Sequence, residues 1–127
     1  MTTSEIATVL AWHDALNAGD IDTLVALSSD DIDVGDVHGA IQGHEALREW
    51  AASSPMTAAE PARMYVRDGM VVVEQRTRLA SDPETITTMA SAFRVVRDHV
   101  TSVFRHQSLA EALAATEMTE RDLTVDA

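Results

Sequence analysis

The chain opens with two stretches of apolar residues at helical spacing. In residues 2–18 the apolar side chains recur every three or four positions, which places them on one face of a helix. These side chains are Ile6, Val9, Leu10 and Leu16. Residues 17–20, Asn-Ala-Gly-Asp, then supply a helix stop and a new N-cap, and a shorter stripe of the same kind covers residues 21–27. The pattern predicts two helices joined by a tight turn.

Beyond residue 30 the apolar period changes from helical spacing to alternation. Ile32 and Val34 alternate with aspartates, as in a half-buried strand, and a helical period returns between Gly43 and Trp50. From residue 56 onward the pattern is typical of strands separated by Asp-Gly, Asp-Pro and Asp-His turns. The predicted strands are residues 63–67, 70–80, 85–97 and 100–107. Long strands joined by short turns predict an antiparallel sheet.

The end of the chain contains one more helix signal and an acidic stretch. Ser108 and Glu111 have the spacing of a capping box, and they open an alanine-rich helix that runs to about residue 115. The last dozen residues are acidic and weakly periodic, so residues 116–127 are expected to form a mobile or loosely docked tail. The chain has no internal repeat and no linker. Residues 1–115 are therefore predicted to form a single α+β domain, with helices first and strands later.

Composition narrows the possible partners and compartments. Apolar residues make up 46% of the 127-residue chain, enough for one core, and 9 basic against 21 acidic residues give a charge of −12. That charge repels phosphate backbones and anionic lipids, so we expect neither nucleic acid nor membrane as a partner. No cysteine is present, which excludes disulfides and thiolate chemistry. Because the chain lacks a signal-peptide pattern and a membrane-length apolar run, a cytoplasmic location is expected.

Three segments of the chain resemble the nuclear transport factor 2-like (NTF2-like) superfamily, which includes SnoaL-like and ketosteroid isomerase-like domains. They are ALNAGDIDTLVALSSDDIDV, GHEALREW and AFRVVRDHVTSVFRHQSLAEAL, and the resemblance extends over about residues 5–114. It implies a cone-shaped, curved antiparallel sheet wrapped around the N-terminal helices, with a mostly apolar internal pocket. It also implies a homodimer through the outer sheet face. Because this fold serves isomerases, cyclases, epoxide hydrolases, dehydratases and non-catalytic proteins, it does not by itself define an activity.

Comparison with ketosteroid isomerase within that superfamily implies that Asp36 is a general base. Counted from the Asp30-Asp31 pair, Asp36 falls on the position of the catalytic aspartate. A carboxylate on an apolar pocket wall has a raised pKa and can take a proton from a carbon next to a carbonyl. His38, two residues on, could orient Asp36 or share its proton, or be an exposed loop histidine. The alternative for Asp36 is a turn residue that accepts backbone hydrogen bonds.

The same comparison places weaker hydrogen-bond donors where the isomerase has strong ones. Trp12 matches a tyrosine of the first helix, and Ser91 matches an aspartic acid of the penultimate strand. Loss of one oxyanion donor typically costs roughly a hundred- to a thousandfold in rate, which argues against efficient steroid isomerisation. Trp50 and Phe93 match aromatic pocket positions, where each could stack on a flat ligand or belong to the core.

The last predicted strand has two faces, and its register decides which one is turned inward. One face carries Val103, Arg105 and Gln107, and the other carries Phe104 and His106. The resemblance favours the first face. It places Arg105 where limonene epoxide hydrolase has a catalytic aspartate, which argues against epoxide opening. An inward Arg105 could pair with Asp36 or bind a carboxylate or enolate. A shift by one residue would instead make His106 a second candidate base.

Two functional hypotheses follow from these residues. The chain could be a small isomerase, cyclase or dehydratase that needs no cofactor and uses Asp36 on a ketone- or polyketide-like substrate. Alternatively, it could be a non-catalytic domain that binds a small hydrophobic molecule or acts through dimerisation. No metal site is expected, because His38 and His44 are six residues apart across a turn and His44-Glu45 lacks a second histidine four residues on.

Overall fold

The structure is a computed structural model that describes residues 2–36, 38–52, 56–79 and 82–125. Its helices are α1 (Thr2–Ala18), α2 (Ile21–Ala26), α3 (His44–Ala52) and α4 (Leu109–Thr116), with a 3-10 turn η1 (Glu120–Asp122). Its strands are β1 (Ser28–Asp36), β2 (Gly39–Gln42), β3 (Met56–Arg67), β4 (Met70–Leu79), β5 (Asp82–Val96), β6 (His99–His106) and β7 (Leu123–Val125). The predicted helices are confirmed. The predicted end of a strand at Ala80 lies outside the described residues.

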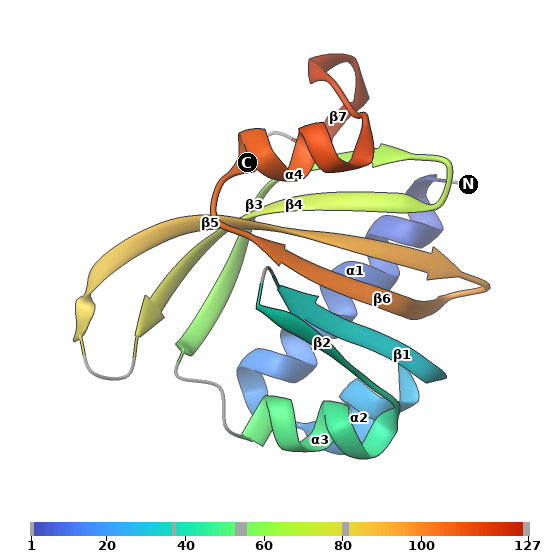
Figure 1. Ribbon diagram of the computed structural model, residues 1–127, viewed down its shortest axis with the longest axis vertical. Coiled ribbons are helices and arrows are strands. Elements are labelled where there is room, and N and C mark those ends of the chain that lie inside the picture. Colours follow the sequence, from blue (N-terminus) through green and yellow to red (C-terminus); the bar gives the residue numbers. More distant parts are fainter. Residues whose placement is uncertain (1, 37, 53–55, 80–81, 126–127) are drawn as a thin grey trace.

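All seven of these strands belong to one curved sheet in the order β2-β1-β6-β5-β4-β3-β7. Every neighbouring pair is antiparallel except β1 and β6, which run parallel. The sheet bends around α1, α2 and α3, whereas α4 lies on its opposite side (Figure 1). This arrangement is the α+β cone expected from the sequence. No helix in the described part of the chain is both long and apolar enough to cross a membrane.

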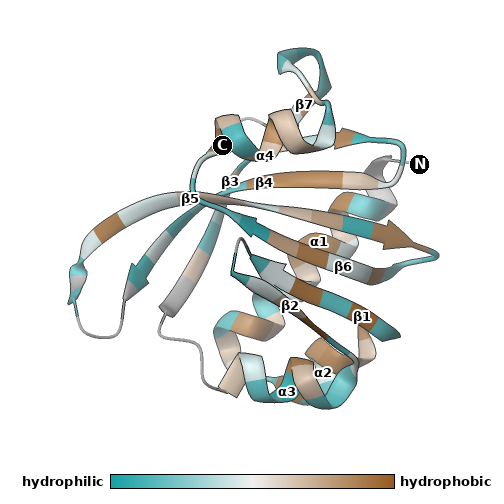
Figure 2. Ribbon diagram, in the orientation of Figure 1, coloured by the Kyte–Doolittle hydropathy of each residue, from teal (hydrophilic) through white to brown (hydrophobic). Residues whose placement is uncertain are grey.

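The central strands are buried on both faces because helices cover both sides of the sheet. Val71 and Val73 of β4 face α1–α3, while Val72 between them packs under α4. The apolar run at the start of β4 is visible in Figure 2. We call the side facing α1–α3 the inner core: Val9, Trp12, Ala15, Leu24, Val25, Ile32, Val34, Leu47, Met64, Val66, Val71, Val73, Phe93, Val95, Val100 and Val103. The outer core consists of Tyr65, Val72, Ala90, Ala92, Ala112 and Met118.

Polar side chains end the helices and attach them to the sheet. Gly19 takes a φ of +69° after α1, and Asp20 accepts a hydrogen bond from the Thr23 amide to cap α2, as the sequence predicts. The Asn17 side chain forms two 2.9 Å bonds to the backbone of Ala59, donating to its carbonyl and accepting from its amide. The end of α1 is thereby fixed to the edge of β3.

Strands β2, β3 and β5 differ from the prediction, and β5 begins at Asp82, three residues earlier than predicted. β2 was expected as turns, but its four exposed residues pair with β1 and give no apolar pattern that would reveal a strand. β3 begins at Met56, seven residues earlier than predicted. The proline and alanines of this stretch do not resemble a strand in sequence. Pro61 is tolerated because the β3–β4 register shifts between Pro61 and Met64 and because β3 lies near the sheet edge.

The segment expected to be a tail is docked on the sheet as far as Val125. β7 pairs with β3, Met118 lies in the outer core, and the Tyr65 hydroxyl donates to the Glu120 carboxylate at 3.1 Å. Burial, followed by the Glu120 contacts, raises the pKa of Tyr65. Residues 126 and 127 lie outside the described residues. The predicted helix of residues 108–115 is therefore followed by an ordered turn and a short edge strand.

Candidate functional site

Pairing between β1 and β6 determines which side chains of the last long strand face the helices. Val34 lies opposite Val103 in this parallel pair, and both side chains belong to the inner core. Because side chains alternate along a strand, the residues two positions further on share that face. Asp36 and Arg105 thus lie on the inner face at the neighbouring ends of their strands. This is the register that the sequence resemblance favours.

The other face of β6 is turned toward α4. Phe104 lies opposite Ala92 and His106 opposite Ala90, and both alanines belong to the outer core. The Phe104 and His106 rings are 4.8 Å apart. Burial lowers the pKa of His106, and the negative charge of Glu111 on α4 acts in the opposite direction. His106 is therefore held mainly by outer-face contacts, although it also borders the cavity described below.

Arg105 is a half-buried cation that lies over an aromatic ring. Its guanidinium carbon lies 4.4 Å from the centre of the Trp50 ring, within the range of a cation–π interaction. Burial lowers the pKa of Arg105 to about 10, and the charge of Asp36 partly offsets this shift. Arg105 therefore remains mostly protonated near neutral pH. It is a positive charge with reduced hydration at the end of the inner face.

Asp36 is the last residue of β1 and lies at the start of the turn to β2. The side chain is exposed, and its Oδ1 accepts a 2.8 Å hydrogen bond from the His38 amide. This backbone contact matches the alternative reading of Asp36 as a turn residue. At the same time Asp36 borders a cavity of about 170 Å³. The lining residues are Asp36, His38, Met89, Arg105, His106 and Gln107. We call this space the Asp36–Arg105 cavity.

Four of the nine residues predicted from the sequence therefore meet at one place. Asp36, His38, Arg105 and Gln107 all line the Asp36–Arg105 cavity. Trp50 contacts Arg105 and so helps to hold this side chain in place. Met89 is an additional lining residue that can supply adaptable apolar contact.

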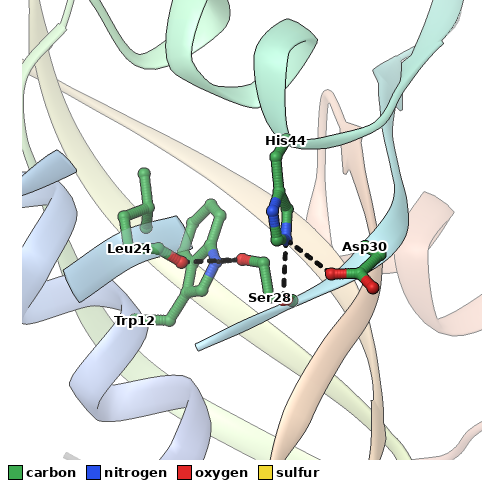
Figure 3. Close-up of polar contacts among 5 residues, drawn as sticks. All are labelled: Trp12, Leu24, Ser28, Asp30 and His44. Atoms are coloured by element: carbon green, nitrogen blue, oxygen red, sulfur yellow. Dashed lines mark hydrogen bonds and ion pairs between the residues drawn. The ribbon is translucent and has the colours of Figure 1, made fainter. Parts of the chain in front are cut away.

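Trp12 lies in the core with its donor already engaged, which corrects its expected role as a pocket donor. Its side chain is 1% exposed, and Nε1 donates to the Ser28 hydroxyl at 3.1 Å. That hydroxyl donates in turn to the Leu24 carbonyl at 2.8 Å, so the indole, the hydroxyl and the carbonyl are linked by two consecutive hydrogen bonds (Figure 3). An indole has a single N–H, so this hydrogen bond occupies the donor that the isomerase comparison assigned to a ligand.

Ser91 is corrected in the same way, because its hydroxyl belongs to a buried chain of hydrogen bonds. It donates to Gln75 Oε1 at 2.9 Å, and Gln75 Nε2 lies 2.8 Å from His13 Nε2. His13 Nδ1 lies 2.8 Å from the Val9 carbonyl. Since a carbonyl only accepts, Nδ1 must carry the proton and Nε2 must accept from Gln75. Every polar group in this chain has a partner when His13 is neutral.

The protein environment keeps His13 in that neutral form. Burial is the largest effect and lowers its pKa, and the positive charge of Arg105 contributes in the same direction. The Val9 carbonyl and Asp14 act in the opposite direction. His13 and Gln75 were not among the predicted site residues. The helical spacing of Val9 and His13 is the sequence signal that could have identified a buried histidine.

Phe93 and Val103 are packed in the inner core and do not line the Asp36–Arg105 cavity. The edge of Phe93 meets Trp12 with ring centres 5.3 Å apart, and Trp12 lies 6.0 Å from Trp50. These aromatic contacts hold Trp50, on which Arg105 stacks. Phe93 therefore supports the cation indirectly, through Trp12 and Trp50, whereas Val103 is a core residue.

No group of three or more histidine, aspartate or glutamate side chains in the described ranges is arranged to hold a metal ion. The titratable groups of the cavity come from three places instead: the end of β1, the following turn and the end of β6.

Comparison with solved structures identifies the fold. A candidate polyketide cyclase from Sinorhizobium meliloti is 20% identical with a TM-score of 0.72, over 79% of this chain and 94% of that one. A candidate ketosteroid isomerase from Kribbella flavida is 16% identical with a TM-score of 0.72, over 81% and 76%. An NTF2-like protein of unknown function from Cytophaga hutchinsonii is 12% identical with a TM-score of 0.71, over 86% and 94%. At these identities the likeness establishes the fold alone.

Sequence comparison defines the family more directly. A search among curated proteins found no significant match. The profile of the SnoaL-like domain, in contrast, matches residues 9–106, a span that runs from α1 to the end of β6 and contains Asp36 and Arg105. The chain therefore belongs to the SnoaL-like domain family.

Proposed function

We propose that this protein binds a small molecule in the Asp36–Arg105 cavity, with Arg105 holding an anionic or carbonyl oxygen of the ligand. The observation that carries the proposal is the half-buried guanidinium that lies over the Trp50 ring at the cavity wall. The guanidinium lies over the Trp50 ring, and its N–H groups form a planar set of donors. A carboxylate or enolate is the group that such a planar set of donors binds best.

The size of the cavity limits what it can hold. Ligand pockets commonly measure about 300–1,000 Å³, and a cavity of about 150 Å³ accommodates benzene. The 170 Å³ of the Asp36–Arg105 cavity would therefore take one ring or one polar head group. The lining is polar apart from Met89, which favours the oxygen-bearing end of a ligand. In this proposal a larger hydrophobic part of the ligand lies beyond the cavity.

Proton transfer is a second candidate function, and one observation favours it. A carboxylate and a cation border the same cavity, as enolisation requires. Asp36 would take a proton from the carbon next to a carbonyl, the C–H electron pair would form a carbon–carbon double bond, and the π electrons of the carbonyl would move to its oxygen. Arg105 would stabilise the resulting enolate. Return of the proton to another carbon would complete an isomerisation. Binding is preferred because Asp36 is exposed and because the donors of Trp12 and Ser91 are engaged elsewhere.

The test uses benzoate as an anionic probe and acetophenone as a ketone probe. We expect benzoate to shift the amide NMR signals of His38 and Gln107 in a saturable way. Arg105→Met should weaken benzoate binding about tenfold or more, because it removes the charge and retains a long side chain. Arg94→Met, at an exposed position on β5, is the matched control and should bind benzoate normally.

The same samples separate binding from catalysis. If Asp36 is a base, the methyl protons of acetophenone should exchange with D₂O faster in the presence of the protein, and Asp36→Asn should remove the acceleration. Equal exchange with the protein and with Asp36→Asn would reject the proton-transfer function without affecting the binding proposal. Unchanged benzoate affinity in Arg105→Met would overturn the binding proposal itself.

A further inference from the structure

A second cavity, of about 450 Å³, lies at the opposite end of β6 from the Asp36–Arg105 cavity. It is bordered by the end of α2, the start of β1, the start of α3 and the turn between β5 and β6. Its volume falls within the common range for small-molecule sites. We call it the β1–β6 gap cavity.

An interruption in the strand pairing creates this cavity. Ser28 pairs with Val100 and Asp33 pairs with Ser102, so residues 29–32 of β1 lie opposite the single residue Thr101. Extra residues on one strand open the ladder and redirect side chains, as in a β-bulge. Ser29, Asp30 and Thr101 consequently border the β1–β6 gap cavity. The opening is therefore built into the backbone of the sheet.

The opening leaves one hydroxyl without a partner inside the protein. Ser29 Oγ is buried, and it has no hydrogen bond to any of the residues that the structure describes. Its neighbour Ser28, by contrast, both donates and accepts through its hydroxyl (Figure 3). A buried hydroxyl is unfavourable unless something binds it. A polar group next to this wall of the cavity is thus left unsatisfied within the described structure.

Opposite charges stand on separate walls of this cavity. Asp30 projects from β1, where its carboxylate lies 3.9 Å from His44 Nε2, an atom that also contacts the Ser28 carbonyl (Figure 3). Arg97 projects from the β5–β6 turn, where its φ is +51°. No ion pair joins Asp30 to Arg97 in the described structure. A ligand with both charges could satisfy the two residues together.

The remaining walls add an acceptor and an apolar surface. His99 Nδ1 lies 3.0 Å from the Arg97 carbonyl, so this nitrogen carries the proton and neutral His99 keeps Nε2 as an acceptor. Val25 and Val96 also border the cavity, and Val96 is unusually exposed for its type at 47%. An apolar group of a ligand would cover this valine surface.

We propose that the β1–β6 gap cavity binds a small zwitterion, of which an α-amino acid with an apolar side chain is the simplest kind. Its ammonium group would lie toward Asp30 and its carboxylate toward Arg97. Its side chain would pack on Val25 and Val96. This site is independent of Arg105, so its existence does not depend on the function proposed for the other cavity.

Leucine and two analogues that each lack one charge provide the test. The whole protein is titrated with L-leucine, with 4-methylpentanoate, which lacks the ammonium group, and with 3-methylbutylamine, which lacks the carboxylate. We expect leucine to shift the amide NMR signals of Ser29, Arg97 and His99 in a saturable way. Each analogue should bind about tenfold more weakly or worse, because one charged contact is lost.

Variants at the charged positions identify which end of the ligand each wall holds. Asp30→Asn should weaken binding of leucine and of 3-methylbutylamine, and Arg97→Asn should weaken leucine while leaving 3-methylbutylamine unchanged. Asparagine is chosen at position 97 because it tolerates positive φ. Asp33→Asn and Arg94→Gln change exposed charges outside the cavity and should leave leucine binding unchanged. Absence of saturable shifts with leucine, or equal affinity for all three probes, would overturn the proposal.

Discussion

Single side chains divide into those that satisfy one another in the core and those that border a cavity. Ser91, Gln75 and His13 form a chain in which each donor has an acceptor, so they are removed from ligand chemistry. Asp36 and Arg105 lie at strand ends, border the same cavity and carry opposite charges. Residue type alone does not distinguish these two sets. Burial and partners do.

The neutral state of His13 predicts a pH dependence of stability. Its pKa in the unfolded chain is near 6.5, whereas burial lowers it in the folded protein. Below about pH 6.5 the unfolded chain therefore takes up a proton that the folded protein does not, which favours unfolding. The stabilisation is present above that pH and is lost as pH falls, by at most about 1.4 kcal/mol per pH unit. The free energy of unfolding, measured by urea denaturation at several pH values between about 7.5 and about 5, tests this prediction.

A matched variant isolates this effect. His13→Gln removes the titrating group, so its unfolding free energy should depend less steeply on pH than that of the original chain, even if the variant is less stable throughout. His106 contributes a dependence of the same sign, because burial lowers its pKa too, but that contribution is common to both proteins. Identical dependence of the unfolding free energy on pH in the two proteins would show that His13 binds its proton equally well in the folded and unfolded states.

At the scale of elements, the end of α4 determines how the C-terminal segment returns to the sheet. Glu117 adopts a left-handed conformation with φ of 60°, and the Met118 amide donates to the Leu113 carbonyl at 2.9 Å. This is the hydrogen bond of a Schellman-type helix end, a position that glycine usually occupies. The turn directs Met118 into the outer core and leads the chain to β7. A non-glycine residue here adds backbone strain.

Glu117→Gly should therefore stabilise the protein. Relief of the left-handed strain and removal of a negative charge at the helix C-terminus together should raise the free energy of unfolding by about 1 kcal/mol. Urea denaturation gives the measurement. Glu117→Ala removes the charge but keeps the strain, so it should gain less than the glycine variant. A glycine variant no more stable than the alanine variant would contradict the strain argument.

At the scale of the whole molecule, acidic residues dominate the electrostatics. The charge of −12 is offset by few close ion pairs in the described structure, such as Arg48–Asp22 and Arg63–Glu74, both at 3.2 Å. Like charges spread over one small domain repel one another and favour expansion. Screening by salt should therefore act mainly on repulsion.

Added salt is accordingly expected to raise the melting temperature. An increase from about 0.01 M to 0.15 M shortens the Debye length from roughly 30 Å to 8 Å. The midpoint of thermal unfolding should rise by roughly 2–5 °C, which corresponds to about 1 kcal/mol. Sodium chloride and potassium chloride should act equally, since screening does not depend on the cation. A fall in melting temperature would show that attractive pairs outweigh the repulsion.

The sequence predicted the parts of the fold and site that depend on local pattern. Alternation at Ile32 and Val34 identified β1, and alternation on the last strand placed Arg105 on the same face as Val103. The partners of Ser91 and Trp12 could not be read in this way. Gln75 and His13 are 62 residues apart in sequence and meet only in the folded chain. The hydrogen-bond partner of a buried side chain depends on the tertiary structure, which a local sequence pattern does not specify.

The two edges of the sheet are short or occupied, and this has a consequence for self-association. A long unpaired strand edge is a template on which another chain can add a strand, the first step toward aggregates. β2 forms one edge with only four residues. At the other edge, β7 pairs with β3 at Met64 and Tyr65. Further along β3, the side-chain amide of Asn17 forms hydrogen bonds with both the amide and the carbonyl of Ala59. A single side chain thus takes the place that a foreign strand would otherwise fill.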